Sequence, residues 1–215
     1  AADALAFVRE HLWDGDRLSR RYADGVVKID GYLADYAFLA RGALDLFGAT
    51  GDVDHLAFAL DLAAVIEREF WDESEGTLYF TAEGGESLIA RPQELTDQST
   101  PSSVGVAVEV LDALNHFRDD DTLATIAERV VETHASRVEA DPLQHSSLTL
   151  AADTVTHGAL ELVLVAEDLP TEWQEELATH YLDPSLVAWR SPDEERLAAW
   201  VETLGLEETP PIWAD

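Results

Sequence analysis

Two apolar stripes with helical spacing, joined by a short glycine link, constrain the fold of this chain more than any other feature. Over residues 32–47 the apolar side chains recur every three or four positions, and a second set repeats this spacing over 52–70. That spacing places each set on one face of an α-helix. The link Gly48-Ala-Thr-Gly51 ends in a helix stop signal, and Asp52 is a favourable N-cap for the next helix. The pattern predicts an antiparallel helical hairpin.

Other parts of the chain carry the same helical signal. Further helices are expected over 2–12, 101–117, 121–138 and 145–157. For the helix over 101–117, Thr100 is the expected N-cap and Pro101 the first helical residue. That helix and the next one along the chain predict a second hairpin.

Short β segments and turns are expected between the helices. Residues 77–81 favour a strand, and 87–90 could pair back onto it after the turn at Glu83-Gly-Gly85. The stretch 13–30 is polar and turn-rich, with turn signals at Asp14-Gly15 and Asp24-Gly25. None of these segments predicts a large sheet, so the expected fold class is mainly α.

The last sixty residues have a different character. The dense apolar run Leu160–Ala166 and the segment 185–189 predict buried strands, with a helix over 171–181 between them and another over 193–204. Strand, helix and strand with short links predict a small right-handed βαβ appendage. Two parts are therefore expected: helical hairpins over 1–157, and a small α/β segment over 158–215 packed on them.

The charge balance limits the partners of the chain. The sequence has 44 acidic and 13 basic residues, a formal net charge of −31, and Lys28 as its single lysine. Such a surface repels nucleic acid and anionic membranes, so neither is an expected partner. Acids spread over the whole chain favour adaptation to high salt over a cation-binding acidic tail, because at molar salt the screening length falls to about 3 Å. We expect a haloarchaeal-type protein.

The composition also limits location and cofactors. No run of about 18 apolar residues predicts a membrane span, no signal peptide is recognisable, and a salt-rich cytoplasm is the simplest expected location. Without cysteine the chain has no thiolate or disulfide chemistry. The seven histidines lack the spacing of a helical metal motif, and phosphate-loop and dinucleotide motifs are absent from the sequence. Neither a metal nor a cofactor is expected.

Acidic and aromatic residues near the start of the helix over 32–47 form the first candidate site. Asp35 lies in the first turn, where the helix dipole favours an acid. It could instead face a pocket as a general acid, a general base or a hydroxyl acceptor. Tyr32 and Tyr36 are four residues apart and share a helix face. Two rings beside a carboxylate suit a sugar, although ordinary core packing is the alternative.

The connector between the hairpins supplies the other candidates. Trp71 and Phe80 lie in its loops, where binding residues are common, or they form a small apolar cluster. Arg91 could clamp a carboxylate or phosphate, or pair with Glu94 at the surface. Asp97 offers a second carboxylate. Two carboxylates about 5–10 Å apart across one cavity would favour glycoside chemistry.

Several motifs together resemble the C-terminal portion of the long thioredoxin-domain proteins related to the spermatogenesis-associated thioredoxin-like proteins. The matching segments are Gly31–Phe38, Phe70–Asp72, Leu78–Phe80, Arg91-Pro92, Ser99–Ser102, Leu160–Ala166 and Thr209–Trp213. In that family a thioredoxin-like domain precedes an (α/α)6 toroid similar to the N-acylglucosamine 2-epimerase and six-hairpin glycosidase folds. One departure is that Ser103-Val104 follows Ser102, where the family usually has Gly-Asn. This departure weakens a polar role for that helix start.

The resemblance implies a partial α/α toroid, with about five of the twelve ring helices, taken from a longer protein. We therefore expect either a homodimer or association with a missing N-terminal portion. The implied function is carbohydrate binding, or epimerase- or hydrolase-like chemistry, with Asp35 and Asp97 as catalytic residues. The implied substrate-binding residues are Tyr32, Tyr36, Trp71, Phe80 and Arg91. The alternative is a non-catalytic scaffold or protein-interaction domain of a thioredoxin-domain protein.

Overall fold

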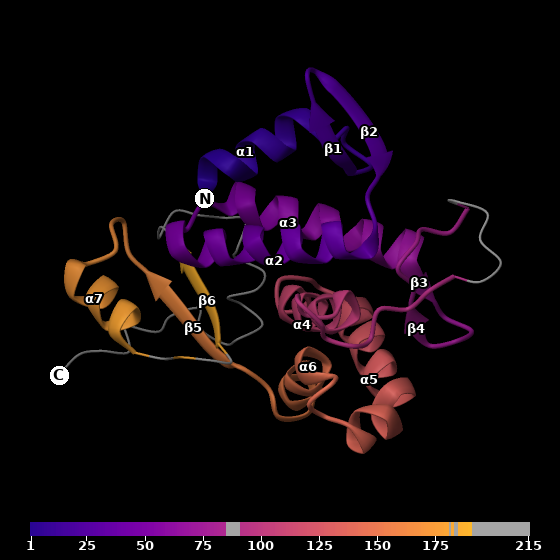
Figure 1. Cartoon of the computed structure of the whole chain (residues 1–215). Helices are drawn as coiled ribbons and strands as arrows, with labels where there is room; N and C mark the ends of the chain where they lie inside the picture. The colour runs from indigo at the N-terminus through magenta and orange to yellow at the C-terminus, as the bar shows by residue number, and fades with distance from the viewer. Residues whose placement is uncertain (85–90, 181, 183–184, 191–215) are drawn as a thin grey trace.

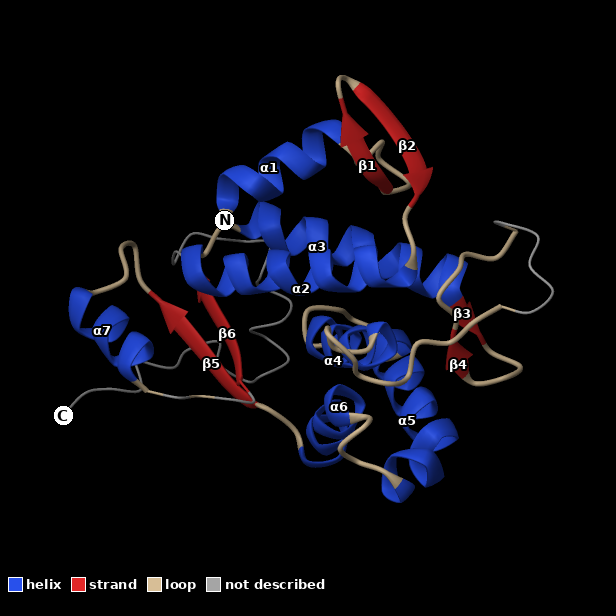
Figure 2. Cartoon of the chain, in the orientation of Figure 1, coloured by secondary structure: helices blue, strands red, loops and turns tan. Residues whose placement is uncertain are grey.

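The computed structural model describes residues 1–84, 91–180, 182 and 185–190, and within them the chain is mainly helical (Figure 2). The helices are α1 (Ala2–His11), α2 (Leu33–Thr50), α3 (Val53–Val65), the π-helical turn η1 (Ile66–Phe70), α4 (Ser103–Asn115), α5 (Thr122–Ala140), α6 (Ser146–His157) and α7 (Thr171–Thr179). The strands are β1 (Ser19–Ala23), β2 (Val26–Asp30), β3 (Trp71–Asp72), β4 (Thr77–Leu78), β5 (Leu160–Val165) and β6 (Ser185–Arg190). None of the described helices has the length and apolar character needed to cross a bilayer.

The first predicted hairpin is confirmed, because α2 and α3 pack side by side (Figure 1). Gly51 ends α2 in the left-handed conformation, with φ 69°, and its N–H donates to the Phe47 carbonyl at 2.8 Å. Asp52 then caps α3, since its carboxylate accepts the Asp54 N–H at 3.0 Å. The stop and start signals of the sequence therefore act at the expected positions.

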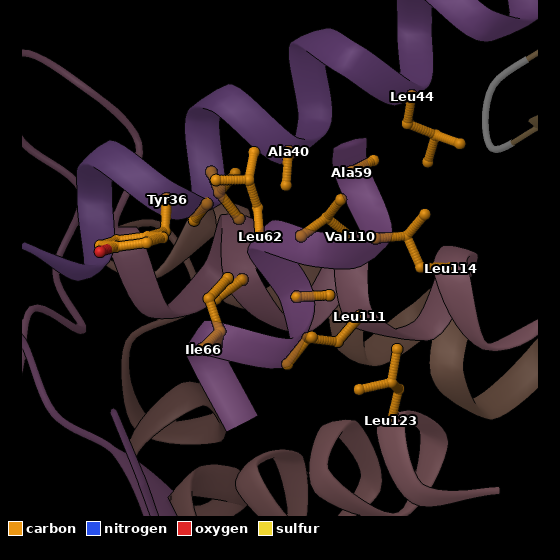
Figure 3. Packing of buried hydrophobic residues seen from close by; sticks show 14 of the residues in the cluster. Tyr36, Ala40, Leu44, Ala59, Leu62, Ile66, Val110, Leu111, Leu114 and Leu123 are labelled. Atoms are coloured by element: carbon orange, nitrogen blue, oxygen red, sulfur yellow. The ribbon is translucent and has the colours of Figure 1, made fainter. Parts of the chain in front are cut away.

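Helix α4 forms the centre of the molecule. It packs against α2, α5 and α6, and nine of its thirteen residues are buried, so apolar neighbours cover it on most sides. Figure 3 shows one continuous cluster in which Leu62 and Ile66 lie with Val110 and Leu111 of α4. The second predicted hairpin, α4 with α5, is also present.

Helix α4 begins later than the sequence predicts. Ser102, and not Thr100, is its N-cap, and the Ser102 Oγ accepts the Gly105 N–H at 2.9 Å. The physical reason lies in the preceding loop, where the Asp97 carboxylate accepts the Ser102 N–H and holds this residue in an extended conformation. Pro101 therefore lies outside the helix.

The stretch 13–30 contains a β-hairpin that the sequence analysis did not predict. Strands β1 and β2 pair antiparallel around Asp24-Gly25, whose φ values of 52° and 75° suit a tight hairpin turn. The turn signal was thus correct, but every residue of β2 is exposed, so no alternating apolar pattern marked a strand. In Figure 1 this hairpin lies beside α1, away from α4 and α6.

The strand expected over 77–81 is shorter than predicted. Only β4 is regular, and it pairs antiparallel with β3, which precedes it in the chain. The second strand expected over 87–90 lies outside the described residues.

The predicted βαβ connection is present. Strands β5 and β6 are parallel, α7 lies between them in the chain, and β6 packs on α2. The contact between α2 and β6 is close because two glycines face the strand. A Cβ added at Gly48 would lie 3.0 Å from the Val187 carbonyl, and one added at Gly51 would lie 2.8 Å from the Trp189 ring. The helix expected over 193–204 and the motif 209–213 lie outside the described residues, and the division at residues 157 and 158 stays a prediction.

Candidate functional site

Three predicted site residues meet at the start of α2. The Asp35 Oδ2 accepts the Tyr32 N–H at 2.9 Å, so this acid caps its own helix. The Tyr32 ring stacks on Phe80, with ring centres 4.7 Å apart and planes inclined by 22°. Arg20 completes the group, since its guanidinium lies over the Tyr32 ring at 5.0 Å and its Nε lies 3.8 Å from the Asp35 Oδ1. We call Arg20, Tyr32, Asp35 and Phe80 the α2-start cluster.

Tyr36 has a different environment from Tyr32. Its side chain is buried, and its hydroxyl accepts the Leu18 N–H at 2.8 Å. The ring packs on Phe70, with centres 5.3 Å apart. Burial raises the pKa of this phenol, although the hydrogen bond from Leu18 opposes the effect. Tyr36 therefore joins the N-terminal segment to α2 from inside the core.

Arg91 holds the backbone of the connector. Its guanidinium donates to the Thr81 carbonyl at 2.6 Å and to the Glu69 carbonyl at 3.2 Å, and it lies over the Tyr79 ring at 4.4 Å. The Glu69 carbonyl belongs to the π-helical turn η1, so one side chain joins the end of that turn to the loop after β4. The Arg91 guanidinium, which was expected to bind a carboxylate or phosphate of a ligand, here donates to carbonyl groups of the same chain.

Trp71 lies on another surface. Its half-buried side chain lines a broad depression of about 930 Å³ between the end of α3 and α5, together with Arg68, Ile126 and Arg129. None of the contacts found for Tyr32, Asp35 and Phe80 within the described residues involves this indole.

Asp97 joins the starts of two helices. One carboxylate oxygen accepts the Ser102 N–H at 2.6 Å and the Ser147 hydroxyl, and the other accepts the Ser147 N–H at 2.7 Å. Burial alone would raise the pKa of Asp97, but the hydrogen bonds from Ser147 and Ser102 outweigh it and lower the pKa. A carboxylate between two helix N-termini is also favoured by both dipoles. The Ser102 N–H at the start of α4 is thus occupied by a carboxylate of the same chain.

Ser147 and Gly105 complete this arrangement, and neither was predicted from the sequence. An added Cβ at Gly105 would collide with the Ser147 Oγ and lie 2.7 Å from the Leu148 nitrogen, so only glycine permits this approach of α4 and α6. The sequence did contain one signal for this approach, since Gly105 lies in the first turn of an apolar helix, where a glycine permits close packing.

A cavity of about 810 Å³ lies between α2, α4 and the β5–α7–β6 unit, and the sequence did not predict it. We call it the junction cavity. Residues that line it include Arg41, Asp45, Glu109, Asp112, His116, Leu177, Leu186 and Trp189. Glu109 and Asp112 of α4 and its C-cap residue His116 follow one helix face, which was a usable signal, but the partners of Glu109 and His116 lie far away in the chain. Within the described ranges, no three His, Asp or Glu side chains gather as metal ligands would.

The fold and these contacts define a mainly helical protein of packed hairpins with a small parallel β unit. The chain is 34% identical to spermatogenesis-associated protein 20 of Rattus norvegicus over 123 residues, which is 52% of this chain. The human protein of the same name is 33% identical over 129 residues, or 54% of this chain. An uncharacterized protein of Caenorhabditis elegans is 24% identical over 222 residues, covering 98% of this chain and 30% of that protein.

This homology supports the family resemblance that the motifs indicate. The chain spans 16% of the length of the rat and human relatives. No protein-family model matches the sequence.

Proposed function

We propose that this chain is part of an α/α toroid in a longer thioredoxin-domain protein, where it acts as a non-catalytic scaffold or interaction domain. The homology to spermatogenesis-associated protein 20 and the packed hairpins support the family and the fold of this proposal. The observation that carries the functional part is the use that the chain makes of its own candidate site residues.

The candidate site side chains form hydrogen bonds with the backbone, and they would have to break these bonds to act on a substrate. A general acid or base must reach the reacting group of a substrate. Both Asp97 oxygens instead accept hydrogen bonds from the starts of α4 and α6, and Asp35 closes the first turn of α2. Arg91 donates to two carbonyls, and the Tyr36 hydroxyl accepts an N–H within the core. Each group stabilises the fold, which is what a scaffold requires.

The exposed apolar residues support an interaction role. Among the described residues, the large apolar side chains left exposed include Phe7 of α1 and Val26, Val27 and Ile29 of β2. They come from two neighbouring elements, since the Phe7 ring contacts Tyr22 of β1 with ring centres 5.5 Å apart, and exposed apolar surface is a feature of interaction sites. The partner in this proposal is either the remainder of a longer protein or a second copy, in a salt-rich cytoplasm that screens the charge of −31.

A second candidate function is sugar binding at the α2-start cluster. The half-buried, stacked Tyr32 and Phe80 offer an aromatic surface, and Asp35 and Arg20 lie beside it. Rings can cover the apolar face of a sugar while the carboxylate and guanidinium bind hydroxyls. The Asp35 side chain is 24% exposed, so a ligand could reach it.

One set of measurements separates the two functions. The chain, the Asp35→Asn variant and the Asp97→Asn variant are tested in molar KCl by glycan array, by thermal shift with simple sugars and by hydrolysis of aryl glycosides. Asp153→Asn, an exposed acid of α6, is the matched control. The scaffold proposal predicts that neither the parent chain nor any variant responds to sugar. It also predicts that Asp35→Asn and Asp97→Asn are less stable than the parent chain, whereas Asp153→Asn is not. A sugar that binds the parent chain but not a stably folded Asp35→Asn variant would establish the second function instead.

A further inference from the structure

The junction cavity has two chemically different walls. One wall is ionisable, with Glu109 and Asp112 of α4, its C-cap residue His116, and Arg41 and Asp45 of α2. The facing β5–α7–β6 unit supplies mostly apolar groups, which are Leu177 of α7 and Leu186, Val187 and Trp189 of β6. A ligand that fits both walls needs a charged end and an apolar body.

The basic group of the cavity is already paired. The Arg41 Nε lies 3.0 Å from the Asp45 Oδ1, and the same guanidinium binds the Glu109 carboxylate. Burial alone would lower the pKa of Arg41, but these two acids raise it, so the guanidinium stays charged and engaged. An anionic ligand would have to compete with two carboxylates for it.

The third carboxylate of the cavity, that of Asp112, has no such arginine partner among the described residues. Within the described part of the chain, no hydrogen bond reaches the Asp112 carboxylate, and burial raises its pKa, although the nearby His116 opposes this effect. The other ionisable group of this wall, His116, lies 3.4 Å from the Oε1 of Glu161 in β5, and Glu161 is not among the described residues that line the cavity. Among the described lining residues, the carboxylates of Asp45, Glu109 and Asp112 outnumber the single guanidinium of Arg41, and a cationic donor would balance this excess.

The apolar wall is held in place. The Trp189 Nε1–H donates to the Ala166 carbonyl at 3.2 Å, and the indole ring faces Gly51, where any side chain would collide with it. The cavity volume of about 810 Å³ falls within the ~300–1,000 Å³ typical of small-molecule sites.

We propose that the junction cavity binds a small organic cation, a primary amine with a compact apolar body. The ammonium group lies toward Asp112 on α4, and the apolar body lies against Leu177, Leu186 and Trp189. This inference does not depend on the scaffold role, because none of the residues of the α2-start cluster lines the cavity.

The test uses cyclohexylamine as the probe and cyclohexanol as its neutral counterpart of similar shape. Binding to the whole chain is measured by calorimetry and by the shift of the Trp189 indole N–H in NMR spectra, assigned with Trp189→Phe. We expect the amine to bind at least about 10-fold more tightly than the alcohol, which corresponds to about 1.4 kcal/mol. Raising the KCl concentration should weaken amine binding, because salt screens the attraction between the ammonium group and the carboxylates.

Two variants make the test specific. Asp112→Asn should weaken amine binding about 10-fold. Ala178→Trp should abolish binding by filling the cavity from α7, a helix without buried residues that tolerates a larger side chain. Asp153→Asn on α6 should change nothing, and circular dichroism checks that each variant is folded. Equal affinity for amine and alcohol, no amine binding, or unchanged amine binding in the folded Ala178→Trp variant would overturn the proposal.

Discussion

The carboxylate of Asp97 accepts the backbone N–H of Ser147 at 2.7 Å, although 50 residues of chain separate them. The same carboxylate accepts the Ser102 N–H. One side chain thus accepts N–H groups at the starts of both α4 and α6, and it fixes the distance between the two helix starts.

Asp97→Asn should destabilise the fold by about 2 kcal/mol, because an amide presents an N–H₂ group to donors that need an acceptor. Urea denaturation in molar KCl measures the difference. The lowered pKa of Asp97 adds a second expectation. The native carboxylate binds its proton less readily than the unfolded one, so its contribution is present above pH ~4 and is lost as pH falls through the native pKa.

The pH dependence provides the control. The stability difference between the parent chain and Asp97→Asn should shrink as the pH falls below about 4. Asp153→Asn should stay within ~0.5 kcal/mol of the parent chain at every pH. A difference for Asp97→Asn that is the same at pH 7 and pH 3 would show that the carboxylate charge has no part in the effect.

Two glycines in helices should respond in opposite directions to alanine. Gly105→Ala should destabilise the protein by about 1–3 kcal/mol, because the new methyl group meets Ser147 and the Leu148 backbone. Gly42→Ala in α2 should stabilise it by up to ~1 kcal/mol, since no atom lies within 4 Å of the added Cβ and alanine favours a helix. Chemical denaturation of both variants measures this pair of effects, and a stabilised Gly105→Ala would refute the close approach of α4 and α6.

His134 should make stability depend on pH near neutrality. Its buried Nε2 lies 2.7 Å from the Thr77 Oγ1, and burial, followed by Arg137 and His145, lowers its pKa. The unfolded chain therefore takes up a proton at a higher pH than the native protein does. The contribution is present above pH ~6.5 and is lost as the pH falls through the lower native pKa, with a slope of up to ~1.4 kcal/mol per pH unit.

Denaturation series between pH 5 and pH 8 (about the range in which histidine titrates) test this point. The parent chain should lose stability toward the acid end, and His134→Gln should lose that part of the slope. His157→Gln, at an exposed position in α6, should keep the slope of the parent chain. Identical slopes for the two variants would contradict the assignment.

Tyr36→Phe should cost about 1–2 kcal/mol, because it leaves the buried Leu18 N–H without its acceptor. Tyr22→Phe removes a hydroxyl from a partly exposed ring of β1 and should change stability by less than ~0.5 kcal/mol. Thermal unfolding of both variants in the same buffer compares them, and equal effects would argue against the hydrogen bond as the cause.

Local signals predicted much of the helical framework. Gly51 and Asp52 mark the turn between α2 and α3 through their own backbone preferences, so no distant contact was needed to place them. The β1–β2 hairpin escaped prediction because Val26, Val27 and Ile29 of its second strand all face solvent. A strand with no buried side lacks the alternation that marks a strand in sequence.

Among the candidate site residues, Asp35 has a role set by a local contact, whereas the roles of Asp97 and Arg91 depend on contacts between distant segments. The first-turn position of Asp35 pointed to a helix-stabilising role, and its bond to Tyr32 is local. Nothing near Asp97 in the sequence indicated Ser147, and nothing near Arg91 indicated the Glu69 carbonyl. The junction cavity was hidden for the same reason, because its walls come from segments more than a hundred residues apart.

The attachment of the β5–α7–β6 unit has a consequence for the order in which the chain is made. Helix α2 contacts this unit through β6, whose Leu186 and Ala188 enter the common core, whereas α7 has no buried residue. On a ribosome, β5 and α7 emerge first and must wait for the strand that anchors them. A nascent chain that stops at residue 184 would therefore leave β5 without its pairing strand and without the contact to α2 that β6 provides.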